Sequence, residues 1–156
     1  MKSQKEMGSI KILIALDCTA YSKTIVEEVS LRPFPLNTKV HIVTAFERTP
    51  LLTPMGSVGV SQELYAEVDQ HALKAAQNVI DKAAEILRKK NPSLNVTTVV
   101  VEGSPNNVIL EEAETFGADL IVVGSNGSGV VERFILGSVS HSVALNAKCS
   151  VAIIRK

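Results

Sequence analysis

The chain contains no tryptophan, only two cysteines and no excess of charge of either sign. Its 16 lysine and arginine residues balance 16 aspartate and glutamate residues, so the formal net charge is zero. Proteins that bind nucleic acids neutralise phosphates with a basic surface, and no cluster of basic residues interleaved with aromatic residues occurs here. The composition therefore argues against a dedicated nucleic-acid-binding protein.

Long hydrophobic runs are also missing. The first nine residues, MKSQKEMGS, are polar and lack the apolar core of a signal peptide. The longest apolar runs have the length of a strand, well short of the roughly 20 residues that a membrane helix needs. The two cysteines, Cys18 and Cys149, have neither metal-ligand spacing nor the density of a disulfide framework. We expect a cytoplasmic protein that does not enter the membrane and whose cysteines are ordinary thiols.

What the chain does have is a regular alternation of short apolar runs with longer segments of helical periodicity. Hydrophobic residues make up 46% of its 156 residues and charged residues 21%, which is typical of a folded domain. Some of the short runs are apolar almost throughout, as strands covered on both faces are. Strands are expected at residues 10–16, 39–46, 95–101, 120–123 and 150–154.

Four helices are expected between these strands. The first begins near Tyr21 and ends before Pro33; the third has Ser104 as its cap, Pro105 at its first position and Gly117 at its end. The last helix is expected at 137–146. The second is the longest, and its predicted buried stripe consists of Leu64, Val68, Ala72, Ala75, Val79, Ala83 and Ile86.

This alternation predicts one α/β domain over residues 1–156, with a polar tail at 1–8 and a flexible loop at 47–60. Parallel strands need crossover connections, so the helices should cover both faces of a doubly wound, five-stranded parallel sheet. The loop at 47–60 is unusually apolar for a connection. A lid over a ligand, a contact with a partner and a plain connector are all open interpretations of it.

Ligands of doubly wound sheets bind outside the carboxyl ends of the strands, where the strand order reverses. Asp17 follows the first strand, and the glycine-rich stretch 124–140, GSNGSGVVERFILGSVS, follows the fourth. Glycines let a ligand approach the main chain, and the helix near Gly137 offers unpaired N–H groups to an anion. A di- or triphosphate would suit that end, and the ribose or base of a nucleotide, or a metal, would suit Asp17. A plain turn explains the glycines about equally well, since the P-loop and the dinucleotide-binding fingerprint are both missing.

The spacing Gly124-x2-Gly127-x9-Gly137-Ser138 resembles the G-x2-G-x9-G-[ST] motif of the universal stress protein family. The flanking segments are similar as well: KILIALDCTAYS to the family's first strand and turn, with Thr19 in place of serine, and SVSHSVALNAKCSVAIIRK to its closing helix and strand. The resemblance covers nearly the whole chain.

The resemblance implies a flavodoxin-like, Rossmann-like sheet of order 3-2-1-4-5 that binds ATP, with Mg²⁺ or Mn²⁺ bridging the phosphates. The adenine and ribose end would be lined by Ala15, Leu16, Asp17, Ala45 and Val123. The ribose and phosphates would be held by Gly124, Asn126, Gly127, Gly137, Ser138, Val139 and Ser140. Some family members carry His or Arg where this chain has Asn126.

Candidates for catalysis of ATP hydrolysis are poor. His41 and His71 are not expected to point at a terminal phosphate. His141 falls within reach of the first turn of the last helix but is better explained as a surface or packing residue, and Arg133 is the only cation between Gly124 and Gly137. We therefore expect a nucleotide-dependent regulator of the stress response with little or no turnover. A nucleotide-free dimeric interaction module of the same fold and a slow ATP hydrolase are the alternatives.

A homodimer is expected through the last strand, 150–154. If this strand forms the edge of the sheet, its SVAII run leaves a row of unpaired backbone groups, which proteins usually cover or pair. The family resemblance implies the same pairing. The polar tail could cover the edge instead.

Overall fold

The computed structural model describes residues 9–48, 61–125 and 136–155. The elements in chain order are β1 (Lys11–Ala15), α1 (Tyr21–Ser30), β2 (Lys39–Phe46), α2 (Gln62–Lys90), β3 (Asn95–Glu102), α3 (Pro105–Phe116), β4 (Leu120–Gly124), α4 (Ser138–Asn146) and β5 (Ser150–Ile154). In the described ranges, no helix is both long enough and apolar enough to cross a membrane.

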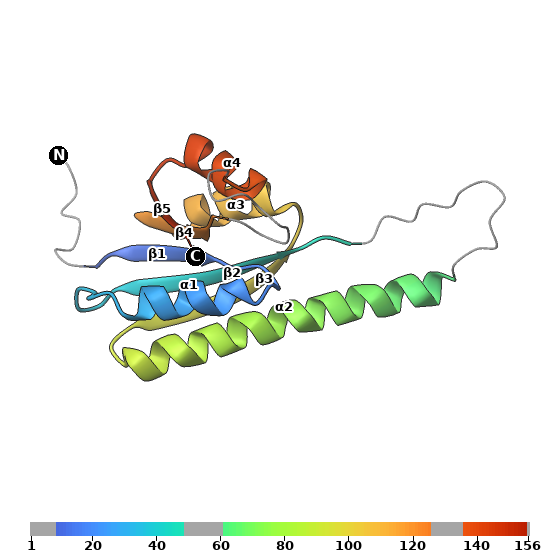
Figure 1. The fold of residues 1–156 in the computed structure, drawn as a ribbon, viewed down its shortest axis with the longest axis horizontal. Helices are drawn as coiled ribbons and strands as arrows, with labels where there is room; N and C mark the ends of the chain where they lie inside the picture. Colours follow the sequence, from blue (N-terminus) through green and yellow to red (C-terminus); the bar gives the residue numbers. More distant parts are fainter. Residues whose placement is uncertain (1–8, 49–60, 126–135, 156) are drawn as a thin grey trace.

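The five strands form one parallel sheet of order β3-β2-β1-β4-β5, as predicted. Helices α1 and α2 cover one face of this sheet, and α3 and α4 cover the other (Figure 1). The order reverses beside β1, which pairs with β2 on one side and with β4 on the other. The carboxyl ends of β1 and β4 therefore meet at the point where a doubly wound sheet binds ligands.

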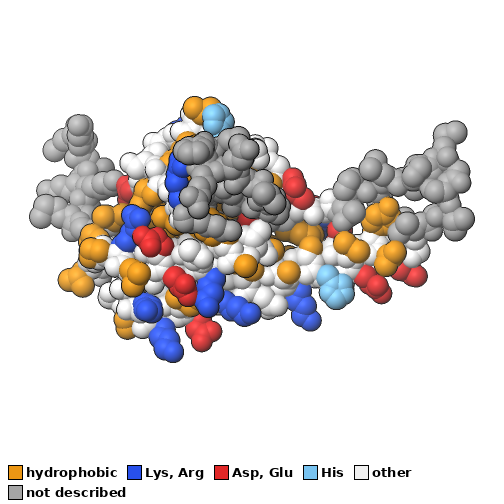
Figure 2. Space-filling model, in the orientation of Figure 1, with side chains coloured by type: hydrophobic (Ala, Val, Ile, Leu, Met, Phe, Trp, Pro, Cys, Tyr) orange, Lys and Arg blue, Asp and Glu red, His pale blue; other side chains and the backbone are white. Residues whose placement is uncertain are grey.

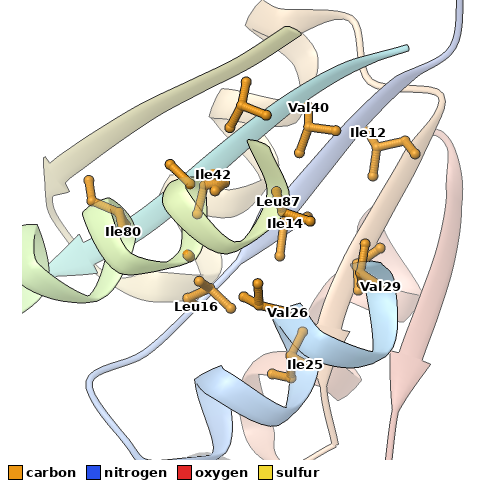
Figure 3. Close-up of a cluster of buried hydrophobic side chains, with 14 of the residues drawn as sticks. Ile12, Ile14, Leu16, Ile25, Val26, Val29, Val40, Ile42, Ile80 and Leu87 are labelled. Atoms are coloured by element: carbon orange, nitrogen blue, oxygen red, sulfur yellow. The ribbon is translucent and has the colours of Figure 1, made fainter. Parts of the chain in front are cut away.

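The core consists of two layers, because successive side chains of a strand point to opposite faces. Ile12 and Ile14 of β1 pack with α1 and α2, in the cluster that Figure 3 shows. Leu13 and Ala15 pack on the other face with residues of α3 and α4. Ile14, whose register partners are Ile42 and Val122, is fully buried at the centre of the sheet.

The predicted stripe of α2 is wrong for the first turns of that helix. Leu64 and Val68 are 49% and 46% exposed, and Ala75 is exposed as well. The buried face of the helix is formed by Ala76, Ile80, Ala83, Ala84 and Leu87. The helix has 29 residues, about 44 Å, whereas the eight-residue strand β2 spans only about 27 Å. The first half of α2 therefore projects beyond the sheet (Figure 1).

The ends of the helices follow their sequence signals in part. Gly117 ends α3 in the left-handed conformation, with φ 69°, as a C-terminal glycine does. Ser104 occupies the N-cap position of α3 before Pro105, but its side chain makes no capping hydrogen bond. The side chain of Ser61 does cap α2, where it accepts a hydrogen bond from the backbone N–H of Leu64.

Candidate functional site

A cavity of about 460 Å³ lies at the carboxyl ends of β1, β2 and β4. Ten of the twelve predicted site residues line it: Ala15, Leu16, Asp17, Ala45, Val123, Gly124, Gly137, Ser138, Val139 and Ser140. The other two, Asn126 and Gly127, lie outside the described residues. The fold thus brings segments more than 100 residues apart in the sequence to one cavity, and their role in binding stays a prediction.

Five further lining residues were missed by the sequence analysis: Cys18, Ile25, Val43, Pro105 and Ile109. Val43 had a usable signal, because it lies two residues before Ala45 and so points to the same face of β2. Pro105 and Ile109 had none. They belong to α3, whose position over the carboxyl ends of the strands depends on tertiary packing.

Asp17 is held by the turn that follows β1. Its Oδ1 accepts hydrogen bonds from the backbone N–H of Thr19, at 3.0 Å, and from the Thr19 hydroxyl. The hydroxyl of Ser22 lies 2.6 Å from the carbonyl oxygen of Asp17 and 3.1 Å from its Oδ1. These contacts fix the direction of the carboxylate before any ligand arrives.

The start of α4 forms the other end of the cavity. Gly137 occupies the N-cap position without a capping side chain, and the first helical hydrogen bond is donated by the N–H of His141 to the carbonyl of Gly137, at 2.9 Å. The backbone N–H groups of Ser138, Val139 and Ser140 precede that bond and have no partner within the helix. Helix N-termini of this kind attract anions.

The two serines of this turn differ in their surroundings. Ser138 is exposed, whereas Ser140 is only 2% exposed. The Ser140 hydroxyl is 3.1 Å from the carbonyl oxygen of Ser125 and 3.0 Å from that of Gly137, so it donates within the protein. Ser138 is therefore the better placed of the two to donate a side-chain hydrogen bond to a ligand.

Cys18 is the nucleophilic side chain on the cavity wall. The residue as a whole is exposed, but its thiol is partly buried, and this partial burial, followed by the charge of Asp17, raises the pKa of the thiol above the ordinary value. The thiol form therefore prevails at neutral pH. This protonation state argues against an activated cysteine nucleophile.

The histidines lie elsewhere. His41 of β2 is bonded to its neighbours: its Nδ1 is 2.7 Å from the Thr97 hydroxyl, its Nε2 is 3.4 Å from a carboxylate oxygen of Glu112, and its ring stacks on Phe116. His71 and His141 are exposed. Of the lining residues in the described part of the chain, none is a histidine.

Within residues 9–48, 61–125 and 136–155, no group of three or more His, Cys, Asp or Glu side chains could hold a metal ion.

The fold and the cavity define a doubly wound α/β protein with a cavity at its topological switch point. Comparison with known families matches residues 10–155 to the universal stress protein family. The chain belongs to this family. It is 37% identical over 101 residues to a universal stress protein of Methanocaldococcus jannaschii. The matched residues make up 65% of this chain and 54% of that one. It is 38% identical over 93 residues to the universal stress protein YxiE of Bacillus subtilis. The matched residues make up 60% of this chain and 59% of that one. These matches thus span little more than half the length of either relative.

Solved structures of the family share the fold. The universal stress protein UspA of Lactobacillus plantarum superposes with a TM-score of 0.74 at 20% identity, over 94% of this chain and 97% of that one. A universal stress protein in complex with cAMP superposes with a TM-score of 0.62 at 19% identity. The match covers 95% of this chain and 98% of that one. A universal stress protein family protein of Arabidopsis thaliana with AMP bound superposes with a TM-score of 0.57 at 20% identity. The match covers 94% of this chain and 92% of that one.

Proposed function

We propose that this protein binds an adenine nucleotide, ATP with Mg²⁺, and acts as a nucleotide-dependent regulator with little or no turnover. The proposal rests on one observation. A single cavity is lined both by an apolar slot, formed by Val43, Ala45, Ile109 and Val123, and by the N-terminus of α4, which has no side-chain cap. An adenine nucleotide has a matching two-part chemistry, a flat aromatic ring whose faces pack on apolar side chains at one end and phosphates at the other.

The apolar slot suits the base. Side chains of Val43, Ala45, Ile109 and Val123 line the cavity from β2, α3 and β4. Its volume of about 460 Å³ falls within the range of roughly 300–1,000 Å³ of small-molecule sites, and such sites are mostly apolar with a few polar groups. The ring would be held by shape and by exclusion of water.

The polar end suits the ribose and the phosphates. The fixed carboxylate of Asp17 can accept hydrogen bonds from ribose hydroxyls, but it would repel phosphates at contact distance. The N–H groups that begin α4, together with the Ser138 hydroxyl, can donate to phosphate oxygens. Mg²⁺ commonly takes its ligands from substrate phosphates and water, with few from the protein, so this donor set is compatible with a magnesium nucleotide.

Relatives of the same fold support the choice of nucleotide. Two of the structures compared above are described as complexes with cAMP and with AMP. Both ligands contain adenine, ribose and phosphate. At about 20% identity these relatives support the class of ligand, and the choice of ATP rests on the glycine motif.

The test is calorimetric titration of ATP and Mg²⁺ into the wild type, Ala45→Phe and Ala75→Phe. Ala45 lines the slot, so the phenyl ring should occupy the space of the base. Ala75 is exposed on α2 and controls for the substitution itself. We expect a dissociation constant on the order of micromolar for the wild type and for Ala75→Phe, and at least ~10-fold weaker binding for Ala45→Phe. A wild type that binds no nucleotide would favour the interaction module.

We further propose that two copies of the chain pair through β5 in the cytoplasm. β5 is the edge of the sheet next to β4, and edge strands of folded proteins are usually covered or paired. Pairing would extend the sheet across the two copies. The slow hydrolase remains the alternative that turnover of bound ATP would favour.

A further inference from the structure

Tyr21, the first residue of α1, lies directly against the end of β4. Its side chain is buried, with 6% of its surface exposed, and its hydroxyl donates to the carbonyl oxygen of Ile154 at 2.7 Å. A Cβ atom added to Gly124 would come within 2.9 Å of the Tyr21 ring and 2.8 Å of Ile25. Only glycine therefore fits at Gly124 while the ring keeps this position.

The same carbonyl joins Tyr21 to the start of α4. Ile154 also accepts a hydrogen bond from the backbone N–H of Ser125, at 2.8 Å. The carbonyl of Ser125 in turn accepts from the N–H of Gly137, at 2.7 Å, and from the Ser140 hydroxyl. The Tyr21 hydroxyl and the Ser125 N–H therefore share one acceptor, the carbonyl oxygen of Ile154. Tyr21 thus contacts the strand ends on which the first turn of α4 is anchored.

We propose that Tyr21 is a positioning residue for the phosphate end of the nucleotide site. The inference rests on the proposed function. The Tyr21 hydroxyl fixes the carbonyl of Ile154, which also accepts from the Ser125 N–H. Ser125 in turn holds Gly137, which sets the position of the N–H groups of Ser138 and Val139. The Tyr21 hydroxyl bonds to the carbonyl of Ile154, and Tyr21 does not line the cavity. It therefore affects ligand binding only through the position of α4.

The effect should be specific to phosphates. The slot for the base is formed by β2, α3 and β4, and Val43 and Ile109 do not depend on the bonds of Tyr21. Asp17 is held by Thr19 and Ser22, so the ribose end also keeps its own support. Loss of the hydroxyl should loosen the anchor of α4 and leave the nucleoside end in place.

The experiment compares the affinities of the wild type, Tyr21→Phe and Tyr65→Phe for ATP with Mg²⁺ and for adenosine. Tyr21→Phe keeps the ring beneath Gly124 and removes only the hydroxyl. Tyr65 is the other tyrosine of the chain, lies on α2 away from the cavity and is the matched control. We expect Tyr21→Phe to bind ATP about three- to tenfold more weakly and adenosine as the wild type does, while Tyr65→Phe matches the wild type for both.

The outcomes separate the inference from the proposed function. Unchanged ATP affinity in Tyr21→Phe, beside a wild type that binds, overturns the inference alone. An equal loss for ATP and adenosine also overturns it, because Tyr21 would then support the whole cavity. A wild type that binds neither ligand refutes the proposed function and the inference with it. Thermal unfolding of all three proteins checks that each is folded.

Discussion

Ser140 and Asp17 were both predicted to contact a ligand, and both side chains form hydrogen bonds within the protein. The Ser140 hydroxyl donates to backbone carbonyls at the start of α4, and Asp17 accepts from Thr19 in the turn after β1. Groups bonded in this way need little reorganisation when a ligand binds, which favours affinity. Ser138, which is exposed, keeps its hydroxyl available to a ligand at the same turn.

At the residue scale, Cys18 reports on the cavity. Because burial and the charge of Asp17 raise the pKa of its thiol, alkylation should be slow at neutral pH and accelerate as the pH rises towards that raised pKa. Cys18 lines the cavity, so ATP with Mg²⁺ should slow its alkylation several-fold. The measurement is the rate of iodoacetamide labelling, read for each cysteine by peptide mass spectrometry.

Cys149 is the internal control for this labelling. It lies just before β5, outside the nucleotide cavity, and burial followed by the charge of Asp119 raises the pKa of its thiol too. Its labelling rate should rise with pH in the same way and should not respond to ATP. Equal rates at Cys18 with and without saturating ATP would contradict the placement of the nucleotide.

At the scale of elements, α2 divides into a half that supports the sheet and a half that projects from it. Figure 2 shows hydrophobic side chains beside acidic ones along the projecting half. Leu64, Val68 and Leu73 are each nearly half exposed there, whereas Leu87 is fully buried. Hydrophobic residues at helical spacing therefore do not by themselves mark a core.

Two leucines of this helix test the division. Leu87→Ala should lower the free energy of unfolding by ~2–5 kcal/mol, because it removes fully buried atoms and leaves a cavity. Leu73→Ala, the same substitution at a position 46% exposed, should cost less than ~1 kcal/mol. Urea unfolding measures both. Similar costs would mean that the first half of α2 is packed against a partner in solution.

For the molecule as a whole, the proposed pairing of two copies depends on the edge of the sheet that β5 forms. Ile154 accepts its hydrogen bond from Ser125 on the β4 side. Backbone groups of successive strand residues alternate in direction, so those of Val151 should face the open edge. That edge is where a second copy would pair.

Sedimentation of Val151→Pro and Val151→Ala tests this pairing. Proline removes an N–H that faces the edge and should leave the ladder to β4 intact. We expect a dimer for the wild type at micromolar concentration, a dimer for Val151→Ala, which keeps the N–H, and a monomer for Val151→Pro. A monomeric wild type would contradict the dimer, and a dimeric Val151→Pro would place the interface elsewhere.

The strands, their order and the end of the sheet that holds the cavity were predictable from the sequence. Runs that are apolar almost throughout, such as residues 10–16 with Lys11 as the single charge, favour strands covered on both faces, and connections of helical length make such strands parallel. The glycine motif is local in the chain, so it identified the family, and with it the order 3-2-1-4-5, without any knowledge of packing. Asp17, which follows β1, and Gly124, which ends β4, followed from the same reasoning.

Which residues complete the cavity, and which contacts stabilise its shape, depends on tertiary packing. Pro105 and Ile109 line it because α3 packs over the carboxyl ends of the strands. Tyr21 reaches Ile154 across 133 positions of sequence. The overhang of α2 depends on the lengths of the strands beneath it. Such contacts are set by how elements pack against one another, and that information lies in no single stretch of the chain.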